Sequence, residues 1–346
     1  MKFLRLAFYV LIAQLVLSGC AGEGVEETSS SLSSEINFDA YLGRNASTRA
    51  GVTDIDSLKK TGFGVFARYK HNGATSSLMD NEHVTWNGDH WGYTNTRYWP
   101  NEGSVDFYAF APYLKNVKLV NAPDSIKDNP TCIEFTSSTS PVDLVWDVQK
   151  NKTVPTSSTD GKVKFVFKHA LARLGFDITA NQELEENGAV IQVEEVKLYG
   201  DTIVNGAFDI KGYLNLENGG WSRPKDNTRV VYTWTPTGAE DGTNFKLSAS
   251  QLDHTCSKIE NAPNSYLCII PQEKWVAFYL QITYTVQQGT FKEEVKVKKN
   301  LLDVRKQPGV SNPSFPFEKG KAYVFHLILS LDPINFYVTT TVVDWK

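Results

Sequence analysis

Alternation of apolar and polar residues, the pattern of half-buried β-strands, recurs along most of the chain. Near the start, apolar residues occupy every second position around polar Asn37 and Asp39. These apolar positions are Ile36, Phe38, Ala40 and Leu42. Comparable runs follow, including FGVFARY, VDFYAFAPY, VKFVFKH, VAFYLQITYTV, FKEEVKVK and AYVFHLILSL. No long amphipathic helix pattern separates them, so the chain is predicted to be all-β, with antiparallel sandwiches favoured.

Turn signals divide these runs. The segment TWNGDHW places Asn87-Gly88 between Trp86 and Trp91, and an Asn-Gly pair flanked by strand residues predicts a hairpin. The run VDFYAFAPY ends at Pro112, which has no N–H to donate to a strand ladder. Both signals favour short strands joined by tight connections.

The first 35 residues are predicted to lie outside the folded part. Lys2 and Arg5 precede an apolar stretch at 6–17, which is shorter than the roughly 20 residues of a spanning helix and is typical of a secretory signal. Leu17-Ser18-Gly19-Cys20 resembles the lipobox of bacterial lipoproteins. That resemblance implies removal of a signal peptide at 1–19 and lipidation of Cys20. The Gly-, Glu- and Ser-rich residues 20–35 then form a flexible leash.

The remaining length is enough for two domains at about 150 residues each. The segment NKTVPTSSTDGK (151–162) is polar and rich in turn residues, so we interpret it as a linker or long crossover. The predicted domains are therefore an N-terminal one at 36–160 and a C-terminal one at 161–346.

The net charge of −4 and the lack of a basic run argue against a nucleic-acid partner. After Cys20, three cysteines remain, without the close spacing of a zinc site. Cys256 and Cys268 could close a short loop as a disulfide in an oxidising compartment. Whether they pair is left open at this point.

A search for catalytic motifs finds no nucleophile elbow, zinc-protease, phosphate-loop or dinucleotide pattern. His83 and His90 flank the Asn-Gly turn and are interpreted as loop residues, and His169 as a buried structural imidazole. Asp201 and Asp209 could be imagined as a carboxylate pair, but such pairs are common in a β-rich chain. The prediction is a non-enzymatic protein with no cofactor and no metal.

Aromatic residues gather in one short region. They are Trp86, Trp91, Tyr93, Tyr98 and Trp99. Such rings can stack on sugar faces, but a hairpin in a sandwich would bury them, because each large ring removes about 150–250 Å² from water. We favour the core role and keep, as the alternative, a surface lipoprotein that binds glycans through this aromatic cluster. Exposed, coplanar rings would favour the alternative.

Three segments resemble the fimbrillin-like family of bacterial lipoprotein pilins. TRYWPNEGSVDFYAFAPY is similar to its aromatic-Trp-Pro corner and following strand, VKFVFKHALARLGFDI to its strand followed by His-Ala, and GKAYVFHLIL with Trp345 to its C-terminal end. With the strand pattern, this resemblance predicts two tandem antiparallel β-sandwich (transthyretin-like) domains with few short helical turns.

The resemblance implies export as a lipoprotein and cleavage by an arginine-specific protease in the loop after the first strand. Arg49-Ala50 is the first candidate bond and Arg44-Asn45 the second. Cutting would free the strand that carries Ile36, Phe38, Ala40 and Leu42. The vacated groove and its unpaired ladder groups would then accept another strand.

The C-terminal segment PINFYVTTTVVDWK is the candidate donor of that strand. Its apolar positions are Ile334, Phe336, Val338 and Val342. If this strand enters a neighbouring molecule, the protein is a polymerising subunit, whereas pairing within its own domain favours a terminal, anchoring or accessory role. The predicted partners are other fimbrial subunits, the outer membrane through the lipid anchor, and host or bacterial surface ligands.

Overall fold

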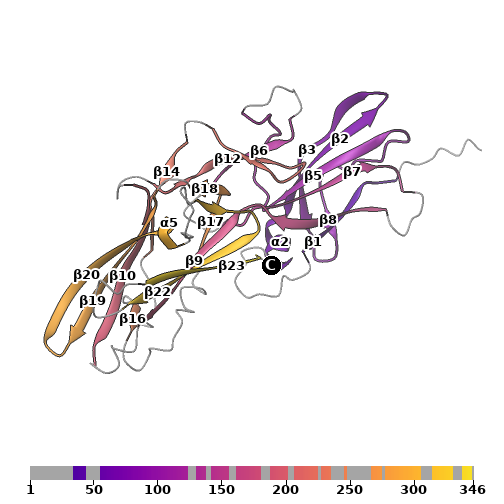
Figure 1. Ribbon diagram of the computed structural model, residues 1–346. Coiled ribbons are helices and arrows are strands. Elements are labelled where there is room, and N and C mark those ends of the chain that lie inside the picture. Colours follow the sequence, from indigo (N-terminus) through magenta and orange to yellow (C-terminus); the bar gives the residue numbers. More distant parts are fainter. Residues whose placement is uncertain are drawn as a thin grey trace, which may run out of the picture. The chain divides into compact units, whose positions relative to one another are not determined.

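The structure is a computed structural model, and it describes most of the chain after residue 33. The described residues are 34–43, 55–123, 130–137, 142–155, 161–180, 188–201, 206–224, 227–234, 245–247, 266–274, 277–304, 314–329 and 337–344. They form β-strands and two short helices, so the predicted all-β class is confirmed (Figure 1).

The first half of the chain builds a seven-stranded sheet. In sheet order its strands are β1 (Asn37–Leu42), β8 (Lys162–His169), β7 (Val145–Lys152), β5 (Ser104–Ala111), β2 (Phe63–His71), β3 (Ala74–Trp86) and β4 (Trp91–Gly92). The alternating pattern of VKFVFKH gives β8 one buried face, with Val163, Phe165 and Phe167 inward. In this order, β1 and β4 are the two end strands of the sheet.

The turn signals act as predicted. β3 pairs with β4 across the Asn-Gly turn, with Trp86 opposite Trp91. Gly88 has a φ of 104°, a conformation that favours glycine because it lacks a Cβ. β5 ends at Ala111, directly before Pro112.

Later segments form five smaller sheets. A five-stranded sheet contains β10 (Val190–Tyr199), β15 (Tyr232–Trp234), β16 (Phe245–Leu247), β19 (Tyr279–Gln288) and β20 (Phe291–Asn300). A four-stranded sheet has the order β17 (Tyr266–Ile269), β9 (Ala172–Ala180), β22 (Lys321–Leu329) and β23 (Tyr337–Asp344). The three smallest sheets are β13 (Trp221–Ser222) with β12 (Lys211–Asn215) and β6 (Cys132–Thr136), β11 (Phe208–Asp209) with β14 (Arg229–Val230), and β18 (Gln272–Lys274) with β21 (Phe315–Phe317).

The described helices are short. α2 (Ile55–Thr61) has Asp56 in its first turn and two lysines in its last turn, which suits the helix dipole. Gly62 ends it with a φ of 66° and donates its N–H to the Leu58 carbonyl, a common C-terminal cap. α5 (Leu301–Val304) is a single turn that follows β20.

Two strand pairings are parallel, which differs from the antiparallel expectation. β1 runs parallel to β8, and β22 runs parallel to β9. Parallel neighbours need a long crossover, and both pairs join segments that lie far apart in the sequence. β8, which follows the boundary predicted near residue 160, belongs to the sheet of β1 and β7. The tandem-sandwich arrangement and the division into two domains stay predictions.

Buried apolar side chains form three clusters. One lies on the inner face of the seven-stranded sheet and includes residues of β1, β2, β5 and β8. A second joins Trp146 of β7 to residues of β12 and β17. The third lies among the later sheets and includes strands β10, β19 and β22. The first cluster positions the candidate site.

Candidate functional site

The first strand, β1, fills part of the apolar core at the end of the seven-stranded sheet. Ile36, Phe38 and Ala40 are buried, and Leu42 is half-buried against the same cluster. Tyr41, on the opposite face, is 49% exposed. The prediction that this segment is a strand with one buried face is confirmed.

The ring of Phe38 lies at the centre of an aromatic group. Its centroid is 5.4 to 6.3 Å from four other ring centroids. These rings belong to Phe63, Tyr93, Phe107 and Phe165. Full burial of a phenylalanine contributes about 1.5–3 kcal/mol. Withdrawal of Phe38 would therefore leave an apolar groove lined by aromatic rings.

Among the described residues, the main chain is hydrogen-bonded on one side along β1 and on a second side at residues 34–36, directly before β1. Along its length it pairs with β8, from Asn37 opposite Lys162 to Leu42 opposite Phe167. At the start, the Ile36 N–H donates to the Arg97 carbonyl at 2.8 Å, and the Trp99 N–H donates to the Ser34 carbonyl at 3.0 Å.

Tyr93 strengthens this contact at the start of β1. Its hydroxyl donates to the Ile36 carbonyl at 2.7 Å and accepts from the Arg97 N–H at 3.1 Å. Burial is the main cause that raises the pKa of Tyr93 above its usual value. The hydroxyl thus links both sides of the contact between β1 and residues 97–99.

The candidate donor strand lies in part within β23. β23 is the last strand of its sheet and pairs with β22 of the same chain, with Val338 opposite Leu327 and Val342 opposite Tyr323. Val342 is 37% exposed and Val343 is 49% exposed. Ile334 and Phe336 lie outside the described residues.

Several predicted site residues also lie outside the described residues. They are Cys20, Arg44, Asn45, Arg49, Ala50 and Cys256. Cys268 is buried on β17, and burial raises the pKa of its thiol well above the usual value. Its pairing with Cys256 stays a prediction. Among the described residues, no helix has the length and apolar character needed to cross a bilayer.

The aromatic cluster of the glycan-binding alternative is largely part of the core. Trp91 and Trp99 are 4% and 3% exposed. The rings of Trp86 and Trp91 make an angle of 68°, and Lys59 lies over the Trp86 ring. Tyr98 is the one exposed ring among the five, at 50%. This geometry favours the core role, because a stacking platform needs exposed, coplanar faces.

The histidines have structural surroundings. His169 is half-buried rather than fully buried, and its Nδ1 lies 2.9 Å from a carboxylate oxygen of buried Asp143, which fits a structural imidazole. His83 was predicted to lie in a loop, but it is a half-buried residue of strand β3 and stacks on Tyr113. His90 contacts Asn87 within the turn, as expected for a loop residue. No group of three or more metal-ligating side chains occurs within the described part of the chain.

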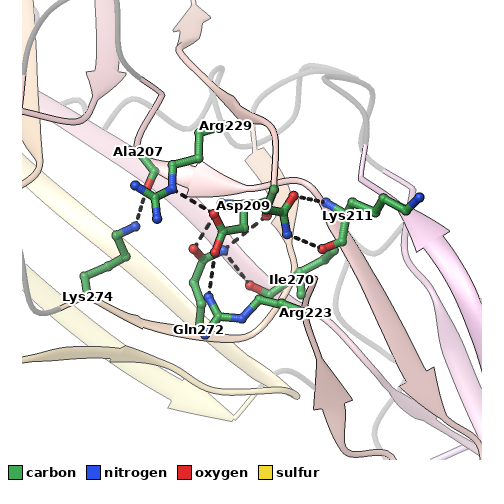
Figure 2. Close-up of polar contacts among 9 residues, drawn as sticks. Ala207, Asp209, Lys211, Arg223, Arg229, Ile270, Gln272 and Lys274 are labelled. Atoms are coloured by element: carbon green, nitrogen blue, oxygen red, sulfur yellow. Dashed lines mark hydrogen bonds and ion pairs between the residues drawn. The ribbon is translucent and has the colours of Figure 1, made fainter. Parts of the chain in front are cut away.

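Asp209 belongs to a charged network rather than to a carboxylate pair (Figure 2). Its two carboxylate oxygens accept from Arg223 and Arg229, each at 2.8 Å. Buried Lys274 donates to the Ala207 carbonyl, and burial lowers the pKa of Lys274 to about 8.

The backbone of the same region is tied to β18. The Gln272 side chain accepts from the Asp209 N–H at 3.1 Å and donates to the Ile270 carbonyl at 3.0 Å (Figure 2). Two guanidinium groups contact the Asp209 carboxylate, and the Gln272 and Lys274 side chains bond to the neighbouring backbone, so these contacts fasten the short strands β11, β14 and β18 to one another. The network therefore has a structural interpretation.

The contacts of Tyr93 and residues 97–99 with β1 were missed by the sequence analysis. Apart from the Tyr93 hydroxyl, these contacts use backbone carbonyls and amides, which no side-chain pattern encodes. The only available signal was Tyr93 itself, which was assigned to the aromatic cluster without a specific partner. The neighbour of β1, β8, was also missed, because alternation identifies a buried face and not a pairing strand.

Comparisons with known proteins agree with this picture. A family model described as fimbrillin-like matches residues 48–345. The chain is 24% identical to the fimbrium subunit Fim1C of Phocaeicola vulgatus, over 97% of this chain and 95% of that protein.

Solved structures share the fold. A crystal structure of a fimbrial protein from Bacteroides vulgatus has a TM-score of 0.63 at 23% identity and covers 90% of this chain and 99% of its own. A cell adhesion protein candidate from Bacteroides uniformis has a TM-score of 0.51 at 18% identity, covering 91% and 98%.

Proposed function

Because the chain belongs to the fimbrillin-like family, a family of fimbrial subunits, we propose that it assembles into a fimbrium by exchange of its first strand. In this proposal, proteolysis separates β1 from the rest of the chain. A strand from another subunit then occupies the groove that β1 leaves. The protein has a structural, non-enzymatic role.

The burial of Phe38 is the observation that carries the proposal. A strand that places one ring against four others contributes a large share of local core, yet it lies at the end of its sheet. Its loss would expose both the apolar groove and the ladder groups of β8. Such an edge is a template for strand addition.

The position of the candidate cleavage bonds supports the same mechanism. Arg44-Asn45 and Arg49-Ala50 both fall between the end of β1 at Leu42 and the start of α2 at Ile55. Cleavage at either bond would leave β1 attached to the body only by non-covalent contacts. Arg49-Ala50 remains our first choice.

We assign the donor strand to the C-terminal segment with Ile334, Phe336, Val338 and Val342. Alternate apolar side chains would enter the groove, and backbone hydrogen bonds would add affinity with little sequence dependence. The end position of β23 favours its availability, because only β22 pairs with it among the described strands.

A second role is favoured by that same pairing. β23 forms eight ladder pairs with β22 of its own chain, from Lys321–Asp344 to Ile328–Tyr337. A subunit that keeps this strand would accept a donor without providing one. It would then act as a terminal, anchoring or accessory subunit.

The lipid anchor completes the proposal. We assign signal removal after residue 19 and acylation to Cys20, which place the protein at the outer membrane and the cell surface. Two or more acyl chains give stable anchoring where one gives only reversible binding. Loss of radiolabelled palmitate incorporation in Cys20→Ser cells would support this assignment, and unchanged labelling would overturn it.

Proteolysis of the purified mature chain tests the assembly mechanism. An arginine-specific protease is added, the new N-terminus is sequenced, and polymers are sought as a ladder on denaturing gels without heating. For the wild type we expect a new N-terminus at Ala50 and a ladder of polymers. If the protease does not cut Arg44-Asn45, the Arg49→Lys variant should show neither. Cleavage without a ladder favours the terminal role, and resistance of the wild type rejects the processing step.

A further inference from the structure

The segment assigned as the donor strand repeats the start of the first strand. The tripeptide Ile36-Asn37-Phe38 occurs again, in the same order, as Ile334-Asn335-Phe336 near the C-terminus. Two positions after the phenylalanine, each segment has a further apolar residue, Ala40 in one and Val338 in the other. The C-terminal segment can therefore be aligned with β1 residue by residue.

The repeated apolar residues are the two most buried of residues 36–42. Ile36 is 0% exposed and Phe38 is 1% exposed, and both belong to the apolar cluster of the seven-stranded sheet. The Phe38 ring centroid lies 5.8 Å from that of Phe165 and 6.0 Å from that of Phe107. A core site accepts a side chain of the same shape and volume best, so an isoleucine and a phenylalanine would refill these places with the same contacts.

The polar residue of the repeat has a local role in β1. Asn37 is exposed, and its side chain donates to the Glu35 carbonyl at 3.4 Å. This bond needs only an asparagine and a carbonyl two residues earlier. Asn335 has the Pro333 carbonyl at that spacing, so the donor strand can form the same bond.

The residue before the repeat is a stricter check, because proline has no N–H to donate. Pro333 would take the place of Glu35. There, the bonds to residues 97–99 use the Ile36 N–H and the Ser34 carbonyl. Within the described part of the chain, no backbone hydrogen bond uses the Glu35 N–H. A proline is therefore compatible with this place, and it favours an extended backbone in the residue before it.

The order of the repeat also favours one direction for the donor. β1 runs parallel to β8, and Phe336 can take the place of Phe38 in either direction. A parallel donor then sets Val338 at the place of Ala40. An antiparallel donor sets the larger Ile334 there, in a buried site that β1 fills with a single methyl group. Overpacking a core site is destabilising, so the parallel direction fits better.

The proline favours the same direction. An antiparallel donor would place Pro333 where Tyr41 lies, opposite Val166 of β8. The Gly43 N–H donates to the Phe167 carbonyl of β8 at 3.3 Å, and N–H groups two residues apart point to the same side of a strand. The Tyr41 N–H therefore faces β8. A proline at this place would remove a ladder bond, whereas a parallel donor keeps its proline outside the ladder.

We propose that the groove of β1 accepts residues 332–340 of a second copy of this chain, running parallel to β8. Ile334 then occupies the place of Ile36, and Phe336 occupies the place of Phe38. This inference rests on the proposed strand exchange and adds the register and the direction of the donor.

The register has a consequence for the donating subunit. Residues 337–340 form four of the eight ladder pairs that β23 makes with β22 in its own chain. A subunit that donates in this register opens these four pairs, while residues 341–344 can stay paired. Donation therefore needs only half of the β22–β23 ladder to open.

Disulfide trapping tests the register. The chain cut after β1 carries Lys162→Cys, and the donor is a synthetic peptide of residues 332–342 with one added cysteine. A peptide with Asn335→Cys meets position 162 in the parallel register, because Asn37 does so in β1. A peptide with Tyr337→Cys meets it in the antiparallel one. We expect the first peptide to form the disulfide about tenfold or more faster, measured by mass without reduction, because a disulfide needs close Cβ atoms.

A second pair of positions keeps the test independent of one variant. With Val166→Cys in the cut chain, the parallel register predicts trapping of a peptide with Thr339→Cys and not of one with Pro333→Cys. Val166 is exposed, so its substitution leaves the core intact. In the uncut chain, Asn37→Cys with Lys162→Cys is the positive control, because these positions are opposite each other. The cut chain without an added cysteine gives the background.

The outcomes separate this inference from strand exchange itself. Uptake of both peptides with equal trapping, or with faster trapping of the antiparallel pairs, would overturn the register and direction while strand exchange stands. Retention of the original first strand at all peptide concentrations would contradict strand exchange and this inference together.

Discussion

β1 and β23 are each the last strand of their sheet, yet they are fastened in different ways. β1 buries alternate side chains in an aromatic core and is hydrogen-bonded on both sides at its start. β23 has a regular ladder to β22, while Val342 and Val343 are partly exposed. The comparison indicates that β1 fills a groove in the core, whereas β23 lies along the edge of its sheet. The proposed strand exchange needs this difference, because the groove of β1 would accept a strand and β23 would donate one.

The largest expected difference is between core truncations in the two strands. Phe38→Ala should lower the free energy of unfolding by about 3–5 kcal/mol, because it leaves a cavity among four rings. Val342→Ala should change it by about 0.5 kcal/mol or less. Urea unfolding of the uncleaved chain measures both, and equal losses would remove the distinction between the strands.

A smaller effect is expected at the start of β1. Tyr93→Phe removes the hydrogen bond to the Ile36 carbonyl and should cost about 1 kcal/mol. Hydrogen exchange should become faster in residues 36–40 and stay unchanged in β23. Tyr98→Phe alters an exposed ring and provides the matched control. Unaltered exchange in β1 after Tyr93→Phe would show that Tyr93 does not hold the strand.

Alkaline pH should loosen β1 selectively. The pKa of Tyr93 is raised in the folded chain, mainly by burial, so the protonated phenol is the form that the fold favours. Its stabilising contribution is complete below the unfolded pKa of about 10 and is lost as pH rises through the folded pKa. Exchange of β1 amides, corrected for intrinsic rates, should rise more above pH 10 in the wild type than in Tyr93→Phe. Parallel profiles would contradict this.

The smallest effect is expected for the surface ion pair beside β1. Lys162 and Asp39 lie 3.8 Å apart and are both partly exposed. Lys162→Gln should cost about 0.3 kcal/mol or less, and added salt should reduce the difference further. Lys321→Gln is the matched variant beside β23, where Lys321 pairs with Asp344 at 2.5 Å. A large loss from Lys162→Gln would mean that charge, not apolar burial, retains β1.

The sequence predicted which face of a strand is buried better than it predicted which strand pairs with it. Alternation in residues 36–42 identified the buried side of β1, and Asn87-Gly88 identified the hairpin, because both signals are local. The parallel neighbour of β1 was not predictable in this way, since β8 lies more than a hundred residues later and any strand with one apolar face would satisfy the pattern.

The candidate site shows the same limit. The apolar residues of β1 were identified because apolar residues occupy every second position along residues 36–42. The contacts of residues 97–99 were not, because they join main-chain atoms whose proximity depends on the tertiary fold.

Native mass spectrometry of the cleaved chain mixed with a synthetic peptide of residues 333–344 tests the central claim most directly. After cleavage at Arg49, the segment that carries β1 should be replaced by one peptide per chain, and a peptide with Phe336→Asp and Val338→Asp should not replace it. Retention of the original segment at all peptide concentrations, or its loss without peptide uptake, would contradict strand exchange at this groove.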